Sequence, residues 1–133
     1  MGSEMCIRDS MLQGGMDRFI NWDKGDFVGK EALVAEKAEG VSKRFVTLVV
    51  DAKERDAPYM STLWHNDKVV GETTSGGWGH RIDKSIALGM LQADLTAPGT
   101  ELEVEIFGER RPAVVQEDQP LWDPANERVR AKA

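Results

Sequence analysis

Residues 100–117 read TELEVEIFGERRPAVVQE, and this stretch decides the fold class. Aliphatic side chains alternate strictly with glutamates in its first half, which is typical of a strand with one buried and one solvated face. Gly108-Glu109 then forms a two-residue connection with glycine first, as a type II′ hairpin turn requires. The sequence therefore predicts an antiparallel hairpin whose inward side chains are Leu102, Val104 and Ile106.

Further β-rich runs, separated by turn residues, precede this hairpin. The expected strands cover residues 45–51, 68–74, 84–91, 100–107 and 110–117. Residues 51–60 are rich in charge and contain Pro58, which favours a long surface loop. Five or six short strands at this spacing predict a mainly β fold: a small antiparallel, Greek-key-like barrel that is closed or nearly closed.

One short helix is expected before the barrel, over residues 30–39. This run is rich in good helix formers, and Gly40 stands where a C-terminal cap is wanted. A helix of about ten residues is marginal alone in water. We therefore expect its apolar stripe, Ala32 and Leu33, to dock against another part of the protein.

Composition excludes several classes of function. The chain has 133 residues, 41% of them hydrophobic and 30% charged, which fits one globular domain or one domain plus a fragment of another. Its net charge of −6 argues against nucleic acid or an anionic membrane surface as a partner. No apolar run approaches the roughly 20 residues that span a bilayer. Cys6 is the single cysteine and cannot form an internal disulfide, so a cytoplasmic location is expected, with an organelle matrix as the other default.

Residues 74–81, TSGGWGHR, are expected to form a glycine-rich loop between two strands, with Gly76 or Gly77 in the left-handed conformation. A hydrolytic triad of Ser75, His80 and Asp83 is disfavoured, because no nucleophile-elbow pattern surrounds the serine. His65 and His80 are the only histidines, and neither has the neighbours that a metal site needs, so no metal is expected.

Several pieces, taken in order, resemble the C-terminal end of the glycine-cleavage aminomethyltransferase family. The ending LWDP and the form SGGWGH at residues 75–80 are more similar to one branch, the folate-linked tail of flavin-dependent dimethylglycine and sarcosine dehydrogenases. The resemblance runs from about Gly15 to Arg130. The pieces are residues 23–33 (DKGDFVGKEAL), 71–77, 86–90 (IALGM), 98–104 (PGTELEV), 110–115 (RRPAVV) and 121–124.

This resemblance implies a domain organisation. Residues 1–10 match nothing in the family and are interpreted as a non-native tail. Residues 11–42 would be the C-terminal remnant of a folate-binding domain, and residues 43–133 the aminomethyltransferase C-terminal β-barrel domain. The parent protein would oxidise an N-methyl amine on FAD, held in an N-terminal domain absent from this sequence, and pass a one-carbon unit to tetrahydrofolate.

Two alternatives stay open. One is the aminomethyltransferase of glycine cleavage, which has no flavin domain. The other is a non-catalytic barrel module that completes another domain's cleft. Expected partners are the remaining domains of the parent chain and folate, without nucleic acid, membrane or metal. No catalytic residue is expected in this chain, because the family's catalytic aspartate lies farther upstream.

The resemblance also implies the cofactor-binding residues. Trp78, His80, Arg81 and Ser75 would lie at the rim of the folate cleft, where tryptophan can stack on a pterin and arginine can pair with a carboxylate. Gln13 stands where the family has a glutamate that holds the pterin; its amide can still hydrogen-bond a pterin edge, although not as a charged acceptor. The alternative is structural: Trp78 would cap the barrel end and Arg81 would be solvated.

Overall fold

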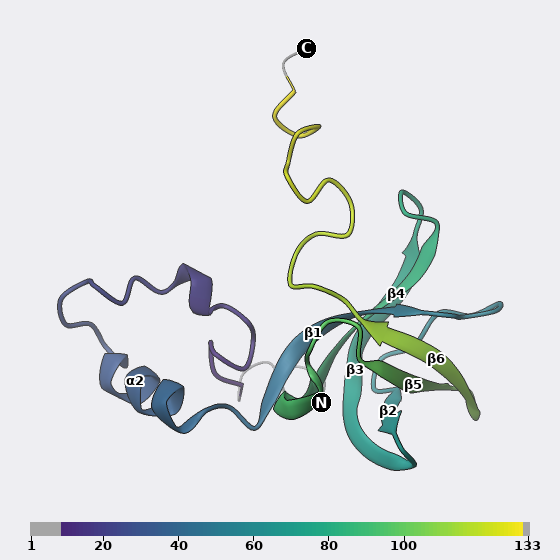
Figure 1. The fold of residues 1–133 in the computed structure, drawn as a ribbon, viewed down its shortest axis with the longest axis horizontal. Helices are drawn as coiled ribbons and strands as arrows, with labels where there is room; N and C mark the ends of the chain where they lie inside the picture. Colours follow the sequence, from purple (N-terminus) through teal and green to yellow (C-terminus); the bar gives the residue numbers. More distant parts are fainter. Residues whose placement is uncertain (1–8, 132–133) are drawn as a thin grey trace.

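The computed structural model describes residues 9–131, which form a β-barrel with a helical segment before it and an irregular tail after it (Figure 1). The predicted non-native tail lies outside the described residues, apart from Asp9 and Ser10. Ser10 Oγ donates a hydrogen bond of 2.6 Å to Glu36, and Asp9 pairs with Lys43 at 2.9 Å.

Six antiparallel strands close the barrel in the order β1-β4-β3-β2-β5-β6. β2, β3 and β4 pair in succession, and a long connection joins β1 to β2 so that β1 lies beside β4, which is the Greek-key arrangement. The mainly β, Greek-key-like barrel is therefore confirmed. The strands are β1 Lys43–Val50, β2 Thr62–His65, β3 Lys68–Gly79, β4 Lys84–Gln92, β5 Glu101–Ile106 and β6 Glu109–Val115.

The barrel interior is an aliphatic core. Leu48, Leu63 and Leu91 have no exposed surface, and they come from three different strands. The three predicted inward side chains of β5 are buried, whereas the glutamates between them are not. Alternation along this strand therefore predicts its orientation correctly: the exposed fractions are 4% for Leu102, 0% for Val104 and 6% for Ile106.

The four-residue strand β2 was not among the expected strands. It pairs with β3 across the turn Asn66-Asp67, whose two residues have positive φ angles of 50° and 60°. Two such angles are typical of a type I′ hairpin, for which asparagine and aspartate are suited. The sequence contains this turn signal, but a strand of four residues is too short to show alternation.

The prediction of a type II′ turn at Gly108-Glu109 is wrong by one residue. Ile106 pairs with Glu109, so the two-residue loop is Phe107-Gly108. Both loop residues have positive φ, 49° and 86°, as in a type I′ turn. Phenylalanine is disfavoured in that conformation, so its presence hid the turn from sequence reasoning.

The strand predicted over residues 68–74 is the first part of β3, but the glycine-rich loop predicted after it is wrong, because β3 continues up to Gly79. Gly76 and Gly77 are not among the glycines with positive φ, so the expected left-handed conformation is absent at both positions. At Gly76 the requirement is for space: a Cβ atom there would overlap the carbonyl oxygen of Ala57. Glycine at this position allows close approach between backbones.

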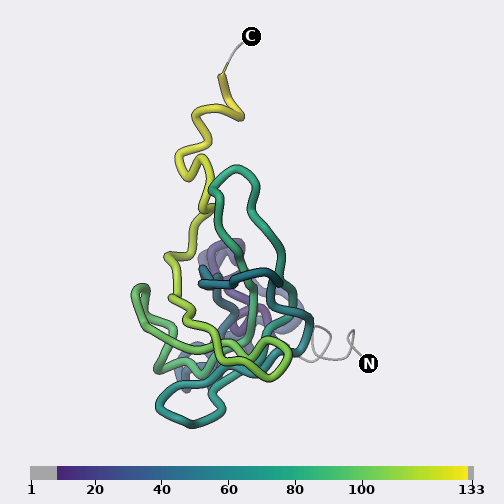
Figure 2. Tube along the Cα trace, turned by 90° about the vertical axis from the view of Figure 1, so that its right-hand side faces the viewer, coloured from purple at the N-terminus to yellow at the C-terminus, as the bar shows by residue number. Residues whose placement is uncertain are grey.

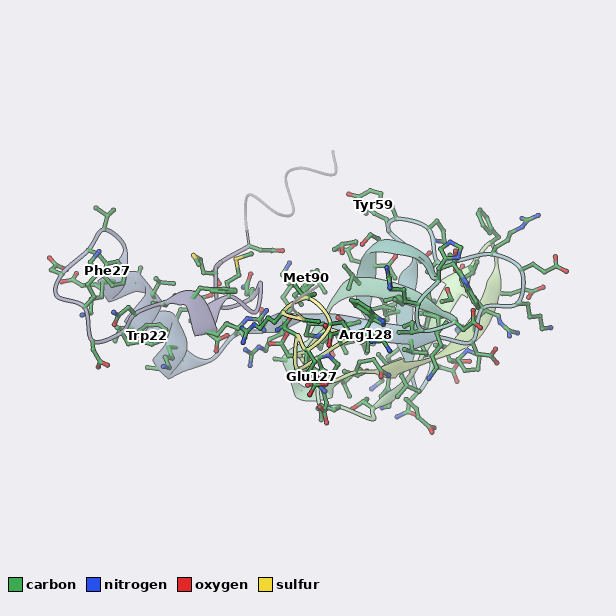
Figure 3. All side chains as sticks on the ribbon, turned by 90° about the horizontal axis from the view of Figure 1, so that it is seen from above. Trp22, Phe27, Tyr59, Met90, Glu127 and Arg128 are labelled. Atoms are coloured by element: carbon green, nitrogen blue, oxygen red, sulfur yellow. The ribbon has the colours of Figure 1, made fainter. Side chains whose placement is uncertain are left out.

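The segment before the barrel stands to one side of it (Figure 1). It contains a 3-10 turn, Asp17–Phe19, and the helix α2, Lys30–Glu39, which confirms the predicted helix. Within the described chain, α2 has no buried residue, so the expected docking of its apolar stripe does not occur here. Trp22 and Phe27 lie far from the barrel (Figure 3).

Candidate functional site

The candidate site is an open groove of about 570 Å³ on the outside of the barrel. Its floor is the outward face of β1, β4 and β3, where Thr47 pairs with Leu88 and Leu88 pairs with Ser75. The tail after β6 forms the opposite wall, and it runs beside the β3–β4 hairpin (Figure 1, Figure 2). The tail residues that line the groove are Gln119, Pro120, Leu121 and Trp122.

A β-bulge in β3 creates this floor. Thr73 pairs with Gly89 and Ser75 with Leu88, so Thr74 is an extra residue that has no pairing partner on β4. Because side chains alternate between the two faces, one extra residue moves everything after it to the other face. Ser75 and the odd-numbered glycines after it therefore face the groove instead of the core.

Gly77 leaves the centre of the floor without a side chain. No heavy atom lies within 4 Å of the position that its Cβ would take. Its neighbour across the sheet is Ile86, which also lines the groove. The floor therefore combines aliphatic side chains with a stretch of accessible backbone, which suits a flat ligand.

The turn after β3 brings the side chains of His80 and Arg81 to the groove. The amides of Ile82 and Asp83 donate to the carbonyl of Gly79, at 3.0 and 2.9 Å, which closes the turn. His80 and Arg81 lie within this turn, line the groove and are exposed.

Arg81 has an aromatic partner from the tail. Its guanidinium carbon lies 4.5 Å from the centre of the Trp122 ring, within cation–π distance. Trp122 belongs to the ending LWDP and was not among the predicted site residues. A site on an external face can be completed by an irregular segment, and no periodic pattern reveals such a segment.

The structure brings together three of the five predicted binding residues: Ser75, His80 and Arg81 all line the groove. Trp78 does not line it, because the alternation of β3 directs this side chain, which is 45% exposed, to the opposite face. Gln13 is also elsewhere, in a turn where its side chain accepts a hydrogen bond from the amide of Ser10.

Electrostatic features outside the groove are structural. The pKa of Arg110 is raised, first by its hydrogen bond to Asp67, and its guanidinium also lies 4.0 Å from the centre of the Trp64 ring.

Among residues 9–131, no group of three or more His, Cys, Asp or Glu side chains could hold a metal ion. No helix in this part of the chain is long and apolar enough to cross a membrane.

Comparison with known proteins agrees with this architecture. Mouse dimethylglycine dehydrogenase, a mitochondrial protein, is 38% identical over 130 residues, which cover 96% of this chain and 15% of that protein. An aminomethyltransferase from Synechocystis is 38% identical over 108 residues, covering 80% of this chain and 29% of that protein. The chain thus spans less than a third of either relative.

A solved structure shares the fold. The glycine cleavage system aminomethyltransferase T from Bartonella henselae superposes with a TM-score of 0.73 at 22% identity, over 84% of this chain and 32% of that one. The family model of the glycine cleavage T-protein C-terminal barrel domain matches residues 43–123, which include all six strands and the groove-lining part of the tail. The chain therefore belongs to the glycine cleavage T-protein C-terminal barrel domain family.

Proposed function

We propose that this chain is the C-terminal part of an amine dehydrogenase that oxidises an N-methyl amine, such as dimethylglycine or sarcosine, and passes the released one-carbon unit to tetrahydrofolate. One observation favours such a dehydrogenase over the aminomethyltransferase of glycine cleavage. The similarity to mouse dimethylglycine dehydrogenase extends over 96% of the chain, whereas that to the Synechocystis aminomethyltransferase extends over 80%. Both matches are longer than the barrel domain at residues 43–123, and the match to the dehydrogenase extends further along the chain.

The segment 11–42 supports a larger parent protein. Large apolar side chains are exposed along it: Met16 by 50%, Phe19 by 71%, Val28 fully and Val34 by 49%. Burying such side chains contributes roughly 1.5–3 kcal/mol each, so leaving four of them in water is unfavourable for an isolated domain. We propose that this segment ends a folate-binding domain whose remainder covers these side chains.

The groove residues fit a folate. A volume of about 570 Å³ lies within the roughly 300–1,000 Å³ typical of small-molecule sites. Trp122 offers an aromatic face, Arg81 a cation for a carboxylate, and Gly77 an open stretch of backbone. Ser75 and His80 add polar groups at the edge. Tetrahydrofolate would supply the nitrogen atoms that accept the one-carbon unit.

FAD would bind elsewhere in the parent. The described residues hold one α-helix, of ten residues, and all strand pairs between them are antiparallel, so there is no parallel βαβ unit of the kind that holds dinucleotides. Catalysis of amine oxidation is therefore assigned to other domains. The cytoplasmic location also stays a prediction, and the mouse relative is named as mitochondrial.

The experiment is to express the complete parent protein and mix it anaerobically with dimethylglycine or sarcosine. Bleaching of a flavin absorbance band on mixing is the expected result. A parent protein that contains no flavin, yet forms methylenetetrahydrofolate from an aminomethylated carrier protein, would favour the glycine-cleavage aminomethyltransferase. A parent protein with neither activity and no folate affinity would favour a non-catalytic barrel module.

A further inference from the structure

The loop between β1 and β2 is fastened to the barrel, although its composition predicts an exposed loop. Ala57, in the middle of the loop, is only 2% exposed and belongs to the hydrophobic core. Its carbonyl oxygen lies against Gly76 of β3, so close that no side chain fits there. The loop therefore touches β3 directly behind the groove floor, on the side away from any ligand.

Thr73 connects this loop to the start of the bulge. Its side chain is fully buried, and Oγ1 donates to the carbonyl of Pro58 at 2.7 Å while accepting from the amide of Ser61 at 2.9 Å. Its backbone makes two more bonds to the loop, to the Ser61 carbonyl at 2.8 Å and from the Met60 amide at 2.9 Å. The residue before the bulge is thus held by four hydrogen bonds from one loop.

A second contact between the loop and the sheet lies next to the end of the glycine segment, residues 76–79. Ser85 of β4 is 1% exposed, and its hydroxyl donates to the Asp56 carboxylate at 2.5 Å. Ser85 pairs with Trp78 in the β3–β4 register. The loop therefore contacts β3 directly at Thr73 and at Gly76, and through Asp56 it holds the β4 residue that pairs with Trp78 at the far end of the glycine segment.

We propose that Thr73 and Asp56 are positioning residues for the groove. They do not line it, yet the loop that they fasten holds the bulge that turns Ser75 and Gly77 outward. Without the bulge, these residues would face the core, because side chains alternate along a strand. Their effect on folate rests on the proposed function; their effect on the shape of the groove does not.

The test compares Thr73→Val, which keeps the shape and removes the hydroxyl, with Thr73→Ser, which keeps the hydroxyl. Thr100→Val is the matched control, because that hydroxyl also donates to a carbonyl, of Ala97 at 2.7 Å, but lies outside the groove. Amide spectra of the labelled 133-residue chain report the bulge through the cross-peaks of Ser75, Gly77 and Gly79. The proposal expects them to move in Thr73→Val and to stay in the other two variants.

Unchanged cross-peaks in Thr73→Val would overturn the proposal. If that variant does not fold, Asp56→Ala replaces it, and unchanged Gly77 and Trp78 amides would overturn the proposal in the same way. In the intact parent, Thr73→Val should weaken folate binding about tenfold, because a shifted bulge no longer presents Ser75 and Gly77 to the ligand, while Thr73→Ser binds like wild type. A wild-type parent that binds no folate would defeat the proposed function, and the spectra would still decide the positioning role.

Discussion

Two adjacent glycines of β3 should respond in opposite ways to the same substitution. A Cβ at position 76 would overlap the backbone oxygen of Ala57, whereas a Cβ at position 77 meets no heavy atom within 4 Å. Both residues have ordinary backbone angles, so neither alanine is strained by φ. Gly76→Ala must push the loop away from the core, and Gly77→Ala only adds a methyl group to the groove.

The magnitude follows from these contacts. Either alanine restricts the unfolded chain and stabilises the protein by roughly 0.4–1 kcal/mol, and this contribution cancels between the two variants. What remains is the overpacking at position 76, typically about 1–3 kcal/mol. Each kcal/mol shifts Tm by roughly 4–8 °C for domains of 60–100 residues and by roughly 2–4 °C for 150–250 residues, so about 4 °C per kcal/mol is expected for this 133-residue chain. Gly76→Ala should therefore melt several degrees below Gly77→Ala.

The assay is thermal unfolding of the 133-residue chain, followed by circular dichroism, with wild type as the reference. Gly77→Ala should melt at or slightly above the wild-type temperature. Equal melting temperatures for the two variants would refute the reasoning, because they would mean that the loop does not press against β3. In the parent protein, Gly77→Val should also lower folate affinity without lowering Tm, since its side chain enters the groove.

Three further predictions concern the barrel. Leu48→Ala should lower the free energy of unfolding by about 2–5 kcal/mol in a denaturant titration, because the side chain has no exposed surface, whereas Glu103→Gln should change it by less than about 0.5 kcal/mol. Phe107→Asn should stabilise the chain by up to about 1 kcal/mol in the same titration, because Phe107 has a φ of 49° that asparagine tolerates better. Asp67→Asn should leave the pH dependence of Tm unchanged between about pH 6 and 9, because the hydrogen bond to Asp67 raises the pKa of Arg110, and any stability linked to that shift is lost only as the pH rises through this pKa, far above the range.

Much of the barrel could be predicted from the sequence because its strands carry local signals. The alternation in β5 shows which residues are buried, and good helix formers followed by Gly40 give the helix its bounds. The partners β1 and β4, in contrast, lie far apart in sequence, and no local pattern states that they pair. A closed or nearly closed barrel could be predicted, but the strand pairs that close it had to come from the structure.

The candidate site could be predicted only in part. The unusual composition of residues 75–81 marks the right region, and three of the predicted residues line the groove. The bulge at Thr74 leaves no trace in composition, and it reverses the face on which Trp78 lies. An arrangement that depends on one extra residue and on an irregular tail cannot be derived from periodicity.

The most direct test of the account is folate binding by the intact parent protein with Arg81 changed. Arg81→Ala should raise the Kd for folate about tenfold, the loss expected for a charged hydrogen bond of ~1.4 kcal/mol, while the rate of anaerobic flavin reduction by the amine stays nearly unchanged. Arg81→Lys, which keeps the charge, is the matched control and should lose less affinity. Equal folate affinities in wild type and Arg81→Ala would contradict the account and leave the groove with a structural role only.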